Sequence, residues 1–186
     1  GVVYKSLTQE ILFHIATLYR TPDLPRVPVY VDSPMATAVT RIFARSREYM
    51  DEEFNMLRET GRIFEADWVH FVSGVKESKE LTASKKPCIV VSASGMCEHG
   101  RILHNLKAGV SAPRTTVVIV GYQAQHTLGR RLVEKKKEVR IFGDTYERKA
   151  EVVDLDAFSA HADRIALLKY VRAVRPKKTV LVHGEQ

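Results

Sequence analysis

The sequence predicts an α/β fold, in which helices flank a mostly parallel sheet. Two observations predict this class. Short apolar runs that are typical of strands alternate with helix-like segments along most of the chain. At 186 residues the chain is also long enough to bury one large hydrophobic core or two small ones. Because no internal repeat interrupts the alternation, we expect layered helices and strands rather than a repeat array.

The first 67 residues are predicted to contain two amphipathic helices with one strand between them. The first helix is expected to bury the face that carries Leu7, Ile11, Ile15 and Leu18. Pro22 and Pro25 end it, and a strand is expected over Val27–Asp32. The second helix is expected to bury Val39, Ile42, Phe43 and Met50. Residues 51–67 are expected to be helical and then loop.

From residue 68 onward, strands and helices are expected to alternate. The predicted strands are Trp68–Ser73, Cys88–Ser92, Thr115–Val120, Val139–Phe142, Glu151–Phe158 and Thr179–His183. The predicted helices are Lys76–Ser84, Gly100–Gly109, Thr127–Lys135 and a segment that Asp163 caps and that ends at Val174.

The composition excludes a membrane-spanning helix, since no apolar run approaches the roughly 20 residues that one requires. Cys88 and Cys97 do not form a Cys-x-x-Cys pair, which favours reduced structural thiols in a cytosolic protein over a disulfide or a metal site. The formal net charge of +7 favours a polyanionic partner, and the aromatic content of only 8% favours contact with phosphate groups over base stacking.

The first of two candidate anion-binding loops, Ser92–Arg101, joins a strand to a helix. A loop of this kind can present backbone N–H groups and the positive end of a helix to a phosphate. The spacing of Gly95 and Gly100 is similar to that of a nucleotide-hydrolysing loop. However, Arg101 and Ile102 replace the lysine and the hydroxyl that such a loop needs. A Gly-rich turn with ordinary helix capping is the alternative interpretation.

The second candidate loop, Gly121–Arg131, also joins a strand to a helix. Arg130 and Arg131 lie in its helical turns and are plausible phosphate ligands. A pair of solvent-exposed arginines is the alternative, and the loop alone favours that alternative.

Two histidines follow predicted apolar strands near the end of the chain. Because a helix separates them, His161 and His183 are expected at the carboxyl ends of strands, where α/β sheets hold their ligands. Histidine can bind a metal or transfer a proton near neutral pH. Taken alone, each would more often be structural, just as Glu10 would more often be an exposed helix carboxylate. The remaining histidines, which lack metal-ligand spacing, are His14, His70, His99, His104 and His126.

Seven stretches together are similar to one known family. They are Thr8–Leu12, Asp32–Ala36, Ser92–Cys97, Gly121–Ala124, Thr127–Arg131, Phe158–Asp163 and Val182–Gln186. The set resembles the β-CASP branch of the metallo-β-lactamase superfamily. These are RNA- and DNA-processing nucleases that include ribonuclease J and the endonuclease subunit of the polyadenylation machinery. The order of the stretches matches from about residue 7 to residue 186, and the two histidine motifs are the most specific part.

The resemblance implies a zinc-dependent ribonuclease. In such enzymes two zinc ions activate a water molecule that attacks a phosphodiester bond. By resemblance, His183 is a ligand of one zinc, and His161 protonates the leaving oxygen while Glu10 orients its imidazole. The residues that the resemblance implies for binding single-stranded RNA are Ser94, Gly95, Arg101 and Arg130.

The resemblance also implies how the chain is divided. Residues 1–21 and 150–186 are expected to be pieces of a metallo-β-lactamase core, and residues 22–149 to be the β-CASP domain. The family's His-x-His-x-Asp-His cluster is missing from the sequence, so we expect a fragment that lacks the N-terminal half of that core. Such a fragment is expected to bind no zinc and to cut no RNA by itself.

The expected partners are single-stranded RNA and, through apolar faces left uncovered, a second copy of the chain; no membrane is expected. The alternative is a non-catalytic nucleic-acid-binding module. A small-molecule Rossmann-like domain is disfavoured, because no Gly-x-Gly-x-x-Gly follows any predicted strand.

Overall fold

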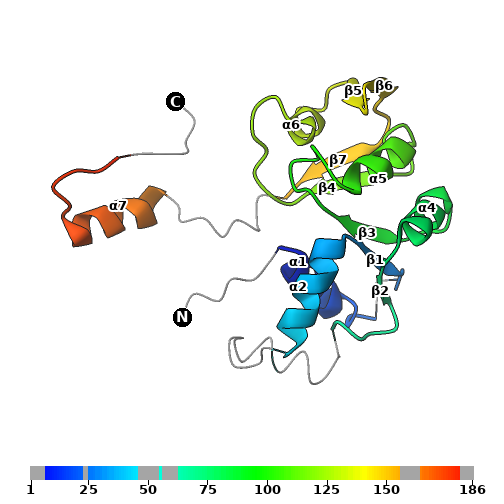
Figure 1. Cartoon of the computed structure of the whole chain (residues 1–186), viewed down its shortest axis with the longest axis horizontal. Helices are drawn as coiled ribbons and strands as arrows, with labels where there is room; N and C mark the ends of the chain where they lie inside the picture. The colour runs from blue at the N-terminus through cyan, green and yellow to red at the C-terminus, as the bar shows by residue number, and fades with distance from the viewer. Residues whose placement is uncertain (1–6, 23–24, 46–54, 56–62, 156–163, 181–186) are drawn as a thin grey trace.

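The computed structural model describes residues 7–22, 25–45, 55, 63–155 and 164–180. Within these residues the predicted α/β class is confirmed, since helices alternate with strands that pair mainly in parallel. The strands in the described part of the chain form three small sheets rather than one continuous sheet. Figure 1 shows them in two lobes, with one helix standing apart from both.

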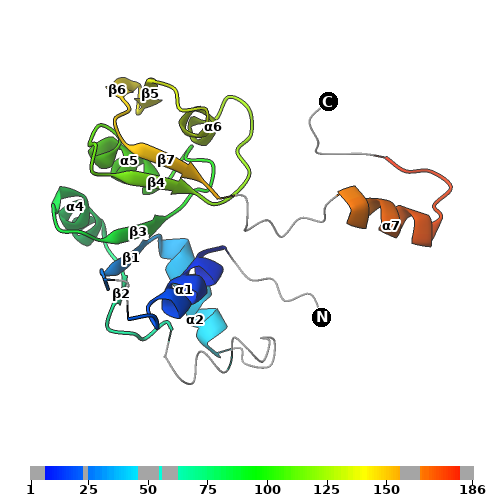
Figure 2. The ribbon, with the colours of Figure 1, turned by 180° about the vertical axis from the view of Figure 1, so that it is seen from behind.

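The first lobe is built on a parallel sheet in the order β2-β1-β3. Its elements are α1 (Leu7–Leu18), β1 (Val29–Asp32), α2 (Pro34–Arg45), β2 (Val69–Phe71), α4 (Val75–Ala83) and β3 (Ile89–Ser92). The sheet lies between α2 on one side and α4 on the other, as the front and rear views agree (Figures 1 and 2). Leu12, Val29, Val31 and Ile63 are fully buried in its core.

The helices of the first lobe form as predicted, but their buried faces differ from the prediction. In α1 the fully buried apolar residue is Leu12, whereas Leu18 is 52% exposed. In α2 the predicted core residue Ile42 is 63% exposed, and small side chains are buried instead. One of these, Thr40, accepts a hydrogen bond of 2.5 Å from Nε2 of the buried Gln9. Helices α1 and α2 therefore meet partly through polar groups, which hydrophobic periodicity does not reveal. The Phe43 side chain and Met50 lie outside the described residues.

The second lobe contains the remaining two sheets. Its elements are α5 (Ile102–Gly109), β4 (Thr116–Ile119), α6 (Leu128–Val133), β5 (Glu138–Ile141), β6 (Asp144–Glu147) and β7 (Glu151–Asp154). Strands β4 and β7 pair in parallel, and β5 and β6 form an antiparallel hairpin. A second hydrophobic cluster, separate from that of the first lobe, includes Val110, Leu132, Val139 and Ile141.

Strand β6 is missing from the sequence-based prediction. The hairpin turns at Phe142 and Gly143, whose φ angles of 52° and 89° are both positive. Such angles suit a two-residue hairpin turn. Phenylalanine rarely adopts a positive φ, so the sequence-based prediction made Phe142 the last residue of a strand rather than part of a turn.

Helix α7 (Arg164–Val174) has no buried residue and stands apart from both lobes in Figures 1 and 2. The strand predicted over Glu151–Phe158 ends at Asp154, and residues 156–158 lie outside the described residues. Thr179 and Val180 are not in a strand, and the rest of the last predicted strand lies outside the described residues. No helix in the described part of the chain is long and apolar enough to cross a membrane.

Candidate functional site

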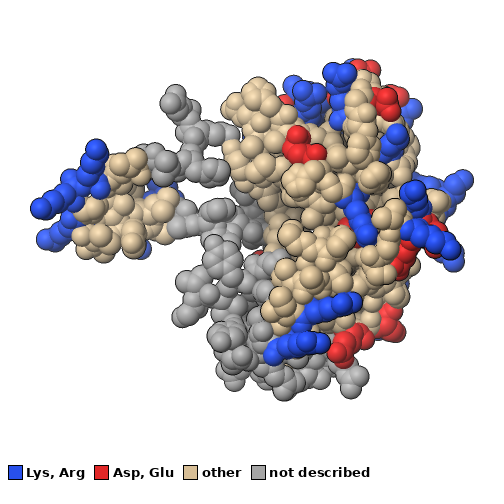
Figure 3. Space-filling model, viewed as in Figure 1, with Lys and Arg blue, Asp and Glu red and all other residues tan. Residues whose placement is uncertain are grey.

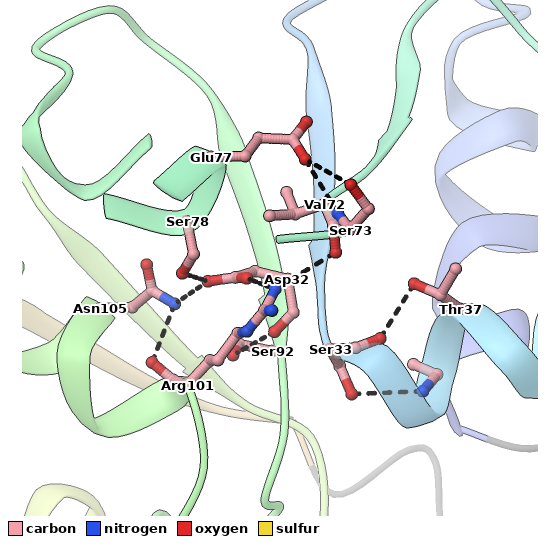
Figure 4. Close-up of polar contacts among 11 residues, drawn as sticks. Asp32, Ser33, Thr37, Val72, Ser73, Glu77, Ser78, Ser92, Arg101 and Asn105 are labelled. Atoms are coloured by element: carbon pink, nitrogen blue, oxygen red, sulfur yellow. Dashed lines mark hydrogen bonds and ion pairs between the residues drawn. The ribbon is translucent and has the colours of Figure 1, made fainter. Parts of the chain in front are cut away.

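The two lobes meet at a buried carboxylate. Asp32, at the carboxyl end of β1, is fully buried, and its Oδ1 lies 2.8 Å from Nη1 of Arg101 in the second lobe. The other carboxylate oxygen accepts hydrogen bonds from Ser78 Oγ at 2.8 Å and from Asn105 Nδ2 at 3.0 Å. Figure 4 shows these side chains converging on Asp32 from α4 and from the start of α5. A buried charge is tolerated when it is paired and hydrogen-bonded in this way.

Arg101 is therefore a bridge between the lobes. Its side chain is only 15% exposed, and Nη1 also donates to the carbonyl of Val72 at 3.2 Å. Arg101 and Asn105 are four residues apart, so they share one face at the start of α5. The arginine that the sequence assigned to phosphate binding has an anionic partner inside the protein.

Within the Ser92–Arg101 loop, several backbone donors are used internally. Ser94 N donates to His99 O at 3.1 Å, and Ile102 N donates to Ala93 O at 3.3 Å. The loop also needs a glycine at position 100, where φ is +85° and a Cβ would lie 2.7 Å from Ala93 O. The loop thus holds its own shape, and the N–H groups of Ser94 and Ile102 already have partners within the protein.

The two strand-to-helix loops are bonded to each other. Gln123 Nε2 donates to Gly95 O at 2.9 Å, and Gly129 N donates to Met96 O at 3.1 Å. Glu98 Oε1 accepts from Leu128 N at 2.5 Å, so a carboxylate of the first loop occupies the start of α6. Ser94, Gly95 and α6 are consequently held together as one unit.

Arg130 lies on α6, where Thr127 caps the helix by accepting a hydrogen bond from Arg130 N at 3.2 Å. The Arg130 guanidinium contacts Glu134, with Nε 2.9 Å from Oε1. Both side chains line an open cleft of about 890 Å³. Arg130 is thus more accessible than Arg101, at 39% against 15% exposure of the side chain.

Glu10 lies in the first turn of α1 and is half-buried. His161 and His183 lie outside the described residues, so their distance from Glu10 is not defined. Among the described residues, no group of three or more His, Cys, Asp or Glu side chains is arranged to hold a metal ion. The described residues therefore do not fit a zinc site by themselves.

Both cysteines are free thiols, as the sequence predicted. Burial, with a smaller contribution from the neighbouring Glu98 charge, raises the pKa of Cys97 to about 11. Burial also raises the pKa of Cys88. Cys97 is therefore protonated at neutral pH and packs as an apolar residue of the second core.

Residues that organise the site were missed by sequence reasoning. Asp32, Gln123 and Glu98 connect its parts through contacts that span 28 to 73 positions of the sequence. One signal was available, because Asp32 ends a buried strand and an acidic residue in that position needs a partner. The identity of that partner could not be obtained without the fold.

Two family models match the chain. The Beta-Casp domain model matches residues 8–132, and the model of the Zn-dependent metallo-hydrolase RNA specificity domain matches residues 145–186.

Three relatives illustrate the range of similar proteins. Ribonuclease TTHA0252 of Thermus thermophilus is 38% identical over 96% of this chain and 41% of its own length. An RNase J-like protein of Methanocaldococcus jannaschii is 33% identical over 96% of this chain and 40% of its own length. Transcription termination factor FttA of Methanosarcina mazei is 30% identical over 96% of this chain and 29% of its own length. The chain spans about two-fifths or less of the length of these relatives. Because the Beta-Casp domain model matches more than half of it, the chain belongs to the Beta-Casp family.

Proposed function

We propose that the complete protein containing this chain is a zinc-dependent ribonuclease that hydrolyses phosphodiester bonds in single-stranded RNA. The observation that carries this proposal is the 38% identity to Ribonuclease TTHA0252 across 96% of the chain. The match of residues 145–186 to a metallo-hydrolase RNA specificity domain supports it. The formal net charge of +7 is also suited to a polyanionic substrate.

Three residues are proposed for the chemistry. His161 protonates the leaving oxygen, Glu10 orients the imidazole of His161, and His183 is a zinc ligand. Each group suits its task, because a carboxylate fixes the tautomer of histidine and raises its pKa. The remaining zinc ligands belong to other parts of the complete protein.

Four residues are proposed for holding RNA. Ser94, Gly95, Arg101 and Arg130 belong to one bonded unit, and Arg130 faces an open cleft. Arg101 has its primary contact with Asp32, so its proposed part is to position the loop that carries Ser94 and Gly95. We further propose that residues 22–149 form the β-CASP domain between two segments of the catalytic core, 1–21 and 150–186.

The test uses the complete protein, with zinc content measured by mass spectrometry and cleavage of a 5′-labelled single-stranded RNA followed on gels. His161→Ala is expected to lower the cleavage rate about 10²- to 10⁴-fold, the range for loss of a general acid. The exposed residue His14 provides the control, since His14→Ala is expected to cleave normally. Glu10→Gln is expected to slow cleavage and to move its pH profile. If Glu10→Gln cleaves RNA at the normal rate, the role proposed for Glu10 is wrong, while the roles proposed for His161 and His183 are unaffected.

A second candidate function is RNA binding without cleavage, as a regulatory or termination factor would need. This second function is supported by several relatives named transcription termination factor FttA, which are 30–32% identical to the chain. A complete protein that binds single-stranded RNA but contains no zinc and leaves RNA intact would favour this second function over the first.

A further inference from the structure

The cleft beside α6 carries basic side chains beyond Arg130, the one that the proposed function already uses. Four basic side chains line it, Arg130 and Arg131 from α6 and Lys136 and Lys137 from the turn that follows. Figure 3 shows Lys and Arg side chains spread over both lobes and α7, so charge alone does not single out a site. This cleft, of about 890 Å³, combines basic side chains with a concave surface.

The backbone that carries the two lysines is held in place. Arg148 donates from Nε to Lys136 O at 3.0 Å and from Nη2 to Lys135 O at 3.2 Å, and its own N–H donates to Lys137 O at 2.7 Å. Lys135 has a positive φ of 55°, which closes the turn after α6. The lysines therefore start from a fixed backbone, which limits the conformational entropy that ligand binding would have to remove.

An internal carboxylate occupies part of this basic surface. Glu134 accepts from Arg130 Nε at 2.9 Å, and its other oxygen lies 3.5 Å from Lys136 Nζ. The hydrogen bond from Arg130, followed by the nearby Lys136 charge, lowers the pKa of Glu134. Glu134 is thus an anion held between two cations. Among the described residues, Arg131 and Lys137 have no ion-pair partner.

The chemistry of the lining favours phosphate groups over bases. Among the described residues, no Phe, Tyr or Trp lines the cleft, so these residues offer no extended aromatic surface on which bases would stack. Arginine and lysine are the residues that contact phosphate oxygens. The hairpin contributes Glu138 and Glu147 to the lining, and these carboxylates repel a phosphate. A nucleic-acid backbone would therefore follow the α6 side of the cleft.

We propose that the α6 side of this cleft binds the phosphate backbone of single-stranded RNA, and that the Glu134 carboxylate competes with RNA for Arg130 and Lys136. This inference rests on the RNA-processing function proposed above. It extends the contact at Arg130 to the rest of the α6 side of the cleft and adds Glu134 as a competitor. Binding here is independent of base sequence, because the contacts are with phosphates.

The test measures binding of a fluorescent, phosphorothioate-linked single-stranded RNA to the complete protein by anisotropy at several KCl concentrations. The double variant Arg131→Gln/Lys137→Gln is expected to weaken binding about 10-fold and to lower the salt slope by about 1.4, the value for two phosphate contacts on a single strand. Glu134→Gln is expected to tighten binding about fivefold, the size expected for removing one like charge roughly 4 Å away in water.

The matched control is Lys85→Gln/Lys86→Gln, which removes the same charge from exposed positions after α4 in the first lobe. This control is expected to bind RNA with nearly the wild-type salt slope. If the cleft variant and the control weaken binding equally, or if Glu134→Gln leaves affinity unchanged or lowers it, the cleft inference is wrong while RNA processing stands. If the wild-type protein binds no RNA, the proposed function fails and the inference fails with it.

Discussion

Arg101 and Arg130 occupy similar places in two loops that each join a strand to a helix, and the two loops are bonded together. Arg101 contacts a fully buried carboxylate in the other lobe, and its side chain is 15% exposed. Arg130 contacts Glu134 on its own helix, and both of those side chains are about 40% exposed. An arginine is thus a structural bridge between the lobes in the first loop, whereas in the second loop an arginine is part of an open surface.

The difference between the loops comes from what lies opposite each arginine. Asp32 ends a buried strand, so its charge has lost water and depends on its protein partners. Glu134 remains in contact with water, which screens its interaction with Arg130. A basic residue in a Gly-rich loop therefore indicates a ligand contact only when no buried carboxylate faces it.

The largest effect on stability is expected from replacing Arg101 with glutamine, and the same replacement at Arg130 is the comparison. Arg101→Gln leaves the Asp32 carboxylate buried without its cation and is expected to lower the free energy of unfolding by about 3–5 kcal/mol. Arg130→Gln breaks an exposed pair and is expected to leave stability nearly unchanged. Urea unfolding of the complete protein, followed by circular dichroism, measures both. Equal losses of stability in the two variants would contradict the proposed difference between the buried ion pair of Arg101 and the exposed ion pair of Arg130.

A smaller effect is expected from the pH dependence of the first loop. Burial raises the pKa of the Cys97 thiol to about 11 in the folded protein, above its ordinary value of 9.0. Between these values the unfolded chain loses the proton and the folded protein keeps it. The unfolded state then binds fewer protons, so stability falls as pH rises from about 9 to 11, by about 2–3 kcal/mol. Below pH 9 this contribution is fully present.

Thermal or urea unfolding across that pH range measures the decline, with Cys97→Ser as the comparison. The variant lacks the thiol and is expected to lose less stability between pH 9 and 11 than the wild type. Parallel curves for the two proteins would show that Cys97 does not carry the effect.

The contact between the loops is expected to have the smallest of these effects. A Cβ at position 129 would lie 2.7 Å from Gln123 Cδ and 3.1 Å from Met96 O. Gly129→Ala is therefore expected to lower stability by about 2 kcal/mol through overpacking. Gly74→Ala is the matched control, because nothing lies within 4 Å of a Cβ there. If Gly129→Ala leaves the free energy of unfolding unchanged, the close contact between the two loops does not contribute to stability.

Much of the fold could be predicted from the sequence, because helices and strands depend mainly on patterns among neighbouring residues. The alternation of apolar strands and helices predicted the α/β class, and most of the predicted strands and helices from residue 68 to residue 154 are present. The separation into three sheets, the hairpin turn at Phe142 and the polar contact between Gln9 and Thr40 were not predicted. Each depends on how distant segments pack, or on a residue in a conformation that it rarely adopts.

The candidate site could also be predicted only in part. Arg101 and Arg130 were recognised as significant from their loops, but their different surroundings required the three-dimensional arrangement. The buried partner Asp32 lies 69 positions before Arg101, a separation over which sequence patterns carry no pairing information. Predictions for His161 and His183 stay predictions, because both residues lie outside the described part of the chain.

The arrangement of the two hydrophobic clusters has a consequence for protein engineering. Each lobe has its own apolar core, which invites the view that the lobes are independent modules that could be excised or exchanged. Their junction contradicts that view, since the cation that neutralises the first lobe's Asp32 is supplied by the second lobe. A cut between residues 92 and 101 would therefore leave one half with an uncompensated buried carboxylate. Chimeras of related proteins should inherit Asp32 and Arg101 from the same parent.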